Sequence, residues 1–184
     1  MGNVGWQVIE PLVTIHPWSM EAIGPDLIAS GLYMSACASA AFQVANAALL
    51  IPFTLTKQVT LVEAFWYNGA TISTYTVDVG VYDASGNLIC HTGSITASGT
   101  SALQINALTA PTTLGPGNFY LAITASNTSM TFFSLAAASV SMLQAYGCCY
   151  IAASDNPLAT GKTLISIATF TRIPIFGVST RGVL

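Results

Sequence analysis

The chain has 184 residues, which suits one domain with a sizeable core. Hydrophobic residues make up 53% of it and charged residues only 6%, whereas an average soluble domain is about 25% charged. The net charge of −3 and the scarcity of Lys and Arg argue against nucleic-acid binding, because phosphate recognition needs clustered cations.

The charged residues are also unevenly placed. No Asp, Glu, Lys or Arg lies between Asp83 and Asp155, so the outer surface of this stretch must consist of Ser, Thr, Asn, Gln and Ala. An uncharged surface favours association. We therefore expect a subunit whose faces are covered by copies of itself or by a larger assembly. A secreted β-domain with a Ser/Thr-rich surface is the alternative.

The high hydrophobic content raises the question of a membrane span. Residues 27–56 carry no charge and are numerous enough to cross a bilayer, but they include Gly31, Pro52 and several polar residues and have no basic flank. We therefore predict no transmembrane helix. The N-terminal residues MGNVGWQVIEP lack a basic start followed by an apolar run, so we also predict no signal peptide. Trp6 stands where N-myristoylation needs Ser or Thr.

The N-terminal part differs in composition from the rest of the chain. Residues 1–46 combine Trp6 and Trp18 with three prolines and a run of small residues, MSACASAA. This mixture predicts an extended N-terminal arm with room for one short helical turn. The remaining residues, 47–184, form the second predicted unit, a β-sandwich domain.

In that domain a period of two predicts short strands separated by turns. The strands, in chain order, are ALLIPFTL, QVTLVEAFWY, TYTVDVGVY, LICHTGS, TSALQIN, NFYLAIT, MTFFSL and one or two within KTLISIATFTRIPIFGV. Pro52 marks an edge strand, and Asn68-Gly69, DASGN and LGPGN mark turns. Ser134 can cap a short amphipathic helix that Gly147 ends. The fold class is therefore all-β: a jelly-roll-like β-sandwich with an extended N-terminal arm and one short α-helix.

The stretch DVGVYDASGNLICHTGS, residues 78–94, gathers acidic residues, a histidine and a cysteine. In a hairpin, Asp78 points away from the neighbouring valines, and Asp83 lies in the turn, where its carboxylate bonds local amides. His91 shares a face with Ile89 and Cys90 takes the other face, so Cys90 and His91 cannot form a nucleophile pair. The stretch predicts a hairpin, and Asp78 has no Lys or Arg near it in sequence as a partner.

The other candidate motifs in the sequence lack residues or context that the corresponding functional sites require. The adjacent Cys148 and Cys149 form a poor metal chelate, and we expect buried free thiols. DASGN lacks the later acidic ligands of a calcium loop. ATGKT at 159–163 has Asn156 where a phosphate-binding loop needs Gly. The glycosylation sequon at Asn127 has no secretion signal. No two carboxylates are paired for glycoside hydrolysis. We therefore predict no enzyme, no catalytic, cofactor-binding or metal-binding residue, and no cofactor.

Aromatic residues offer a different kind of site. Trp6, Trp18, Trp66, Tyr67 and Tyr75 could form a platform that stacks against sugars, with the imidazole of the neighbouring HPW motif at 16–18 beside it. The alternative, which we favour, is that these rings pack in the core or in an interface.

Four pieces between Asn46 and Thr124 resemble β-sandwich structural proteins of tailed bacteriophages. They are NAALLIPFTL, VTLVEAFWYNGATIS, VDVGVYDASGNLICHTGS and LGPGNFYLAIT, and the terminal RIPIFGV is similar too. These pieces are hairpin signatures, so the resemblance carries over no active-site residue. It implies a virion component, either a capsid decoration or cement protein or a tail or fibre protein.

Within that resemblance we expect a capsid cement protein that forms a homotrimer and stabilises the shell. Its partners would be copies of itself and, through the N-terminal arm, the major capsid protein or other virion proteins, with no nucleic acid and no membrane. It would be located in the virion, assembled in the host cytoplasm. The alternative is a tail or fibre module that recognises host surface glycans. The short chain without a fibrous shaft and the low charge favour the cement role.

Overall fold

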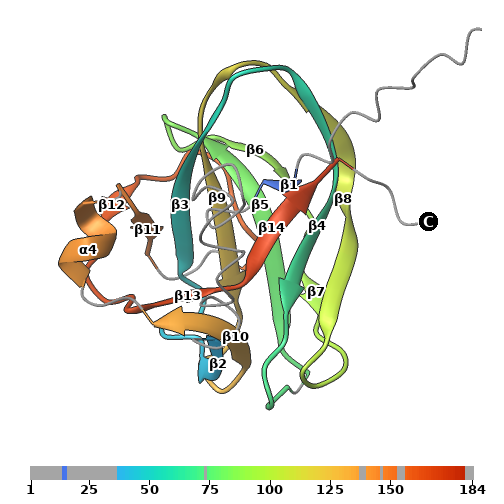
Figure 1. Cartoon of the computed structure of the whole chain (residues 1–184), viewed down its shortest axis with the longest axis vertical. Coiled ribbons are helices and arrows are strands. Elements are labelled where there is room, and N and C mark those ends of the chain that lie inside the picture. Colours follow the sequence, from blue (N-terminus) through green and yellow to red (C-terminus); the bar gives the residue numbers. More distant parts are fainter. Residues whose placement is uncertain are drawn as a thin grey trace, which may run out of the picture.

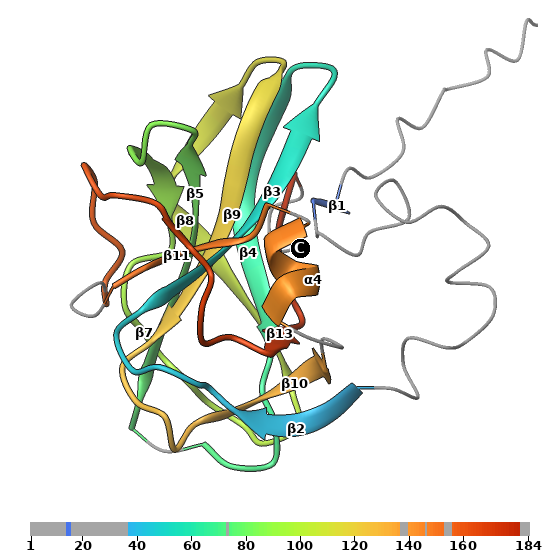
Figure 2. The ribbon, with the colours of Figure 1, turned by 90° about the vertical axis from the view of Figure 1, so that its left-hand side faces the viewer.

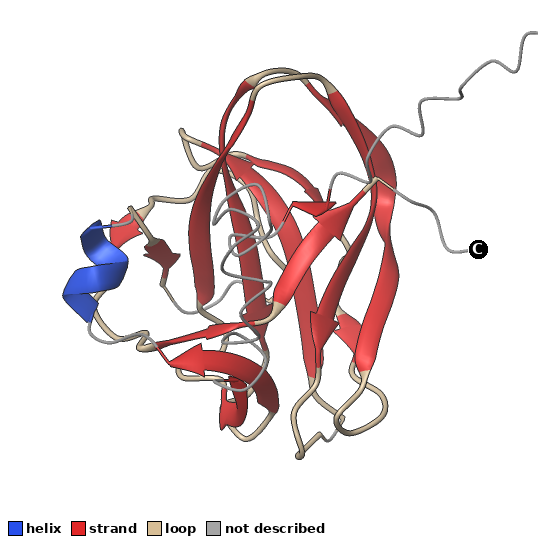
Figure 3. Cartoon of the chain, in the orientation of Figure 1, coloured by secondary structure: helices blue, strands red, loops and turns tan. Residues whose placement is uncertain are grey.

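The computed structural model describes residues 14–15, 37–72, 74–136, 140–145, 147–152 and 156–180. This part of the chain consists mostly of antiparallel strands, with a single short helix (Figures 1 and 3). In chain order the elements are β1 (Thr14–Ile15), β2 (Cys37–Ala41), β3 (Ala48–Leu55), β4 (Val59–Tyr67), β5 (Thr76–Asp83), β6 (Leu88–His91), β7 (Ile95–Thr96), β8 (Leu103–Leu114), β9 (Gly117–Ala125), β10 (Thr131–Ala136), α4 (Val140–Ala145), β11 (Cys149–Ile151), β12 (Ile165–Ser166), β13 (Arg172–Pro174) and β14 (Phe176–Ser179).

The strands form three sheets. Sheet A has the order β1-β14-β4-β8, sheet B has the order β13-β10-β2, and sheet C has the order β12-β11-β3-β9-β5-β6, with β7 also pairing with β5. Sheets A and C face each other, and sheet B lies at one end of the sandwich, at the bottom of Figures 1 and 2. The predicted all-β sandwich is therefore confirmed, and the described residues include one short helix, as expected.

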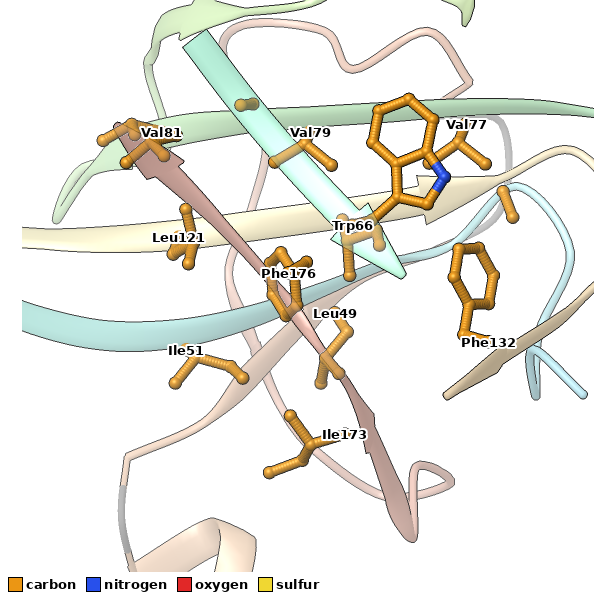
Figure 4. Packing of buried hydrophobic residues seen from close by; sticks show 14 of the residues in the cluster. Leu49, Ile51, Trp66, Val77, Val79, Val81, Leu121, Phe132, Ile173 and Phe176 are labelled. Carbon is orange, nitrogen blue, oxygen red and sulfur yellow. The ribbon is translucent and has the colours of Figure 1, made fainter. Parts of the chain in front are cut away.

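The main core fills the space between sheets A and C (Figure 4). Sheet C contributes the alternating valines of β5 and the inward residues of β3 and β9, while sheet A contributes Trp66 from β4 and Phe176 from β14. Each of these side chains is withdrawn from water because strand alternation turns it to the same side as its neighbours. Fully burying one large apolar side chain contributes roughly 1.5–3 kcal/mol.

Sheet C also has a second, smaller core on its outer face. Its buried members are Ala48, Leu50, Tyr82, Ala122, Ile151 and Leu158. Strand β3 therefore sends Leu49 into the main core and Leu50 into the second core. This double burial explains why the strand reads as a continuous apolar run rather than an alternating one.

Most predicted strands lie where the sequence places them. The predicted start of the helix, with Ser134 as its cap, is wrong. Ser134 lies inside β10 and its hydroxyl donates to the Phe132 carbonyl, so it does not cap the helix, which begins at Val140. The strand continues because β10 pairs with β2 on one side and β13 on the other. Gly147 does end the helix: its φ is 74°, and its N–H donates to the Gln144 carbonyl at 2.9 Å.

Pro52 was predicted to mark an edge strand, but only the part of β3 that contains Pro52 is unpaired on one side. Strand β3 lies between β11 and β9, but its pairing with β11 covers only Ala48, Leu49 and Leu50. Pro52 lies beyond that pairing and has a partner only in β9, at Tyr120. The missing N–H therefore removes no hydrogen bond to β11.

Two described strands lie within the predicted arm, residues 1–46. β1 pairs with β14, and β2 pairs with β10. Both strands add to sheets of their own chain. The other residues of the arm up to Ala36, including His16 and the first two tryptophans, lie outside the described residues.

Candidate functional site

Asp78 is the centre of a buried polar cluster. Its carboxylate is 0% exposed and accepts hydrogen bonds from Thr92 Oγ1 at 3.0 Å and from the Leu158 backbone N–H at 2.9 Å. His91 Nδ1 lies 2.7 Å from Asp78 Oδ2. The sequence offers Asp78 no Lys or Arg nearby as a partner. Its partners are an imidazole, a hydroxyl and a backbone amide, none of which a search for nearby Lys or Arg would find.

The hairpin register explains how Asp78 meets His91. Strand β5 pairs Gly80 directly with His91, so Asp78 is the diagonal neighbour on the same face, within reach of a carboxylate. Cys90 pairs with Val81 and turns into the main core. The predicted separation of Cys90 from His91 is therefore confirmed.

One detail of the predicted hairpin is wrong. Ile89 packs against the main core, on the side of Cys90, and does not share a face with His91. The reason is a β-bulge: Val81 pairs with Cys90 but Tyr82 pairs with Leu88, so Ile89 is an extra residue in the returning strand. Asp83 behaves as predicted, since its carboxylate accepts the backbone N–H groups of Ser85 and Asn87 within the turn.

The Asp78–His91 pair has the orientation that a carboxylate gives to a catalytic imidazole. For nucleophilic catalysis, a hydroxyl or thiol would have to lie within hydrogen-bond distance of the other ring nitrogen, His91 Nε2. Within the described residues, His91 Nε2 makes no hydrogen bond to a hydroxyl or thiol, and Thr92 points its hydroxyl at the carboxylate instead. The hydrogen bonds of Asp78 join strand β5 to Thr92 and to the segment around Leu158.

The segment around Leu158 comprises residues 156–164, which we call the strap. The strap covers the second core and is anchored at several points besides Asp78. Asn156 accepts hydrogen bonds from Ser94 Oγ at 2.7 Å and from Thr76 Oγ1 at 3.1 Å, and Tyr82 Oη donates to the Ala159 carbonyl at 2.8 Å. The ATGKT sequence belongs to the strap, where the Lys162 N–H donates to the Gly86 carbonyl.

The cysteines are free thiols in the described part of the chain. Burial raises the pKa of Cys90 to about 11, and burial together with the neighbouring Cys149 raises the pKa of Cys148 to about 11. Both therefore stay protonated at neutral pH and are poor nucleophiles and poor metal ligands. No cluster of His, Cys, Asp and Glu suited to a metal ion occurs among the described residues.

The structure removes Trp66 from the predicted aromatic platform. Its ring is fully buried in the main core, and its Nε1 donates to Asn68 Oδ1 at 2.9 Å. Asn68 is also buried and donates to the carbonyls of Ser98 and Gly99, so the predicted Asn-Gly turn is a hydrogen-bonded junction. Of the other platform residues, Tyr67 and Tyr75 are half-buried, while Trp6 and Trp18 lie outside the described residues.

The first residues of strand β8 present apolar side chains to solvent, whereas Leu108 and Leu114 further along the strand are buried in the main core. Leu103 is 51% exposed and Ile105 is 49% exposed. Between them Gln104 pairs with the buried Trp66, so the amide side chain is turned toward the inside of the sandwich. Asn106 likewise pairs with the buried Ala64. In residues 103–106 of β8, the usual arrangement of a half-buried strand, apolar inside and polar outside, is therefore reversed.

The exposed residues of β8 belong to a larger apolar surface on the outer face of sheet A. Tyr67 pairs with Leu103 and Phe65 pairs with Ile105, so these side chains share one face. The Phe133 ring packs edge-on against Tyr67 with ring centres 5.0 Å apart. We call this surface the outer patch; its residues are Phe65, Tyr67, Leu103, Ile105 and Phe133.

One acidic residue borders the outer patch. Glu63 pairs with Ala107 on the same face, but it is only 5% exposed, and its Oε1 makes no hydrogen bond to the described residues. The solvent-facing part of this face is therefore its β8 side, where the side chains are uncharged.

No protein-family model and no curated protein sequence matches this chain. Among the described residues, no helix combines the length and the apolar character that crossing a membrane requires.

Proposed function

We propose that this protein is a structural subunit of a virus particle, a capsid cement protein that acts through the surfaces it covers. The observation that supports this role is the reversed strand β8. Leu103 and Ile105 face solvent while Gln104 is turned inward, and an exposed apolar surface of this kind is typical of a contact site.

The charge distribution supports the same role. β8 lies in the long uncharged stretch between Asp83 and Asp155, so the outer patch can be covered without stripping water from an exposed charge. The β-sandwich itself is compatible with many functions. The virion part of the proposal rests on the resemblance of the hairpin signatures between residues 46 and 124.

The abundance of the chain in purified particles tests the proposal. Virus particles are purified on a density gradient, and an antiserum against the purified protein shows whether the protein is present in the particle fractions. Quantitative mass spectrometry then compares its copy number with that of the major shell protein. A comparable copy number is expected for a cement protein. A small fraction of that number would place the chain in the tail, the alternative role, and absence from particles would overturn the proposal.

A further inference from the structure

We propose that the free edge of strand β8, residues 103–107, binds an extended segment of another protein, which adds to sheet A as a further antiparallel strand. The segment would be uncharged and would carry apolar side chains at alternate positions. This inference deepens the proposed function, because it names the kind of partner that β8 takes. It rests on that function only in expecting the partner to be part of the particle.

Strand β8 lies at an edge of sheet A (Figure 1). It pairs with β4 on one side, and no strand of the described residues pairs with it on the other side. With 12 residues it is the longest of the described strands that lie at an edge of a sheet. Its pairing with β4 is regular from Leu103 to Ala107 and then shifts, since residues 108–111 lie between the pairs at Ala107 and Thr112. The regular part of the edge is therefore residues 103–107.

Two neighbouring hydrogen bonds show which backbone groups of this edge point away from β4. The Asn68 N–H donates toward β8, to the Ala102 carbonyl at 2.9 Å, whereas the Tyr67 N–H donates away from β8, to the Ile175 carbonyl at 3.0 Å. Along an antiparallel pair, residues that bond to each other alternate with residues that do not. The even-numbered residues of the edge therefore face β4 with their backbone groups. The odd-numbered residues direct their N–H and C=O groups outward.

The three outward residues are Leu103, Ile105 and Ala107. Their side chains are exposed as well, by 51% for Leu103 and 49% for Ile105. Unpaired N–H and C=O groups along a sheet edge are a template for another strand. Many natural edges are protected by Lys, by Pro or by a bulge, and none of these occurs within residues 103–107. This edge is therefore open to strand addition, the mode in which an extended peptide joins a sheet.

The charge distribution selects an uncharged segment as the partner. β8 lies in the long stretch without Asp, Glu, Lys or Arg, and Glu63, which pairs with Ala107, is buried. A charged side chain placed at this edge would lose water and meet no exposed opposite charge. Apolar side chains at alternate positions of the segment would lie beside Leu103 and Ile105, because directly paired residues share a face.

The described strands of the N-terminal arm are already paired elsewhere. β1 pairs with β14 at the opposite edge of sheet A, and β2 pairs with β10 in sheet B. A second copy of β8 also fits this edge less well than a separate segment. Pairing two copies around Ile105 would set residues 108–111 of one, where the pairing with β4 shifts, beside the turn at Ser101 of the other. An extended segment of another protein brings no such turn.

Hydrogen exchange and NMR titration of the full chain test this edge. In the free protein, the amides of Leu103, Ile105 and Ala107 should exchange quickly, and those of Gln104 and Asn106 slowly. The probe is a capped seven-residue peptide in which Thr and Val alternate, at about 1 mM. It should shift the amide resonances of the three outward residues. Half saturation should halve their exchange rates, because the added strand occupies their N–H groups.

Two N-methylated forms of the peptide are the matched controls. In antiparallel addition each Val lies opposite an outward residue of β8, on the same face, and exchanges hydrogen bonds with it. N-methylation of the Val residues removes these donors and should abolish binding. N-methylation of the Thr residues, whose N–H groups point away from β8, should leave binding unchanged. Contact between side chains alone would not distinguish the two forms.

Four results would overturn the proposal. The first two are a peptide that does not bind and equal binding of the two N-methylated forms. The third is protection of the outward amides in the free chain at every concentration, which would show that the chain's own segments occupy the edge. The fourth is protection that rises with protein concentration, which would show a second copy there.

The titration and the particle measurement can fail independently. A peptide that does not bind, together with a high copy number in particles, would reject this edge and leave the cement role standing. Peptide binding by a chain that is absent from particles would support the edge and reject the cement role.

Discussion

Replacing Asp78 by Ala should detach the strap from sheet C. The carboxylate is fully buried and accepts hydrogen bonds from Thr92 and from the Leu158 N–H, with His91 beside it. After the replacement, His91 can turn to water, because its side chain is 24% exposed, and the Thr92 hydroxyl can donate to the Gly93 carbonyl instead, which lies 3.0 Å away. The Leu158 N–H remains buried without a partner.

The magnitude follows from these three donors. An unsatisfied buried N–H costs about 1–3 kcal/mol, and a hydrogen bond to a charged group contributes about 1.5–3 kcal/mol. Removing the buried carboxylate also removes its own desolvation cost, which offsets part of the loss. We therefore expect Asp78→Ala to lower the free energy of unfolding by about 2–4 kcal/mol. Asp78→Asn should lose only about 1 kcal/mol, since its oxygen still accepts from Leu158.

Urea unfolding followed by far-UV circular dichroism measures the loss, and amide hydrogen exchange at Leu158 locates it. Asp83→Ala is the matched control. Asp83 also accepts hydrogen bonds from three donors, the N–H groups of Ser85 and Asn87 and the Asn87 side chain, but in an exposed turn. The donors that it frees turn to water, so the control should lose less than about 1 kcal/mol. An Asp78→Ala variant no less stable than this control, or with unchanged exchange at Leu158, would refute the reasoning.

Two further predictions concern β5 and the thiols. A Cβ at Gly80 would lie 2.5 Å from the Cys90 carbonyl oxygen, so Gly80→Ala should destabilise the fold by about 2–3 kcal/mol in urea unfolding. Gly115→Ala, where a Cβ meets nothing within 4 Å, should be nearly neutral, and equal losses would contradict the steric argument. The pKa of Cys90 and of Cys148 is raised from 9.0 to about 11, so the unfolded chain releases these protons first and stability should fall as the pH rises through this range. The loss is at most about 2–3 kcal/mol per thiol. Urea unfolding at about pH 8 and about pH 10.5 measures how much the free energy of unfolding falls between the two pH values. The fall should be smaller for the double variant Cys90→Ala/Cys148→Ala than for the wild type. Equal falls would exclude the thiols as the cause.

The hairpin of β5 and β6 shows what local sequence can predict. Alternation of valines, a turn of small and polar residues and a carboxylate at Asp83 were sufficient to place both strands and to separate Cys90 from His91. The bulge at Ile89 was not predictable from alternation, because an extra residue in a strand leaves no mark in the period.

The contacts of Asp78 depend on long-range packing. Its hydrogen bond to Leu158 joins residues 80 positions apart, and that distance in sequence carries no periodic signal. The outer patch is an intermediate case. The alternation of Leu103 and Ile105 with amides is visible in the sequence, but only the pairing of Gln104 with Trp66 shows which side faces inward.

The reversed strand gives the protein a competing register during folding. A slip of one residue along β4 would carry Leu103 and Ile105 to the inside and Gln104 to the outside, but it would also turn the buried Leu108 and Leu114 outward. The native alignment is therefore maintained from outside this stretch, by the hydrogen bond from the Asn68 N–H to the Ala102 carbonyl at 2.9 Å and by the pairing of Val59 with Leu114. Loosening either end would favour the slipped register, in which Leu103 and Ile105 no longer lie on the outer face.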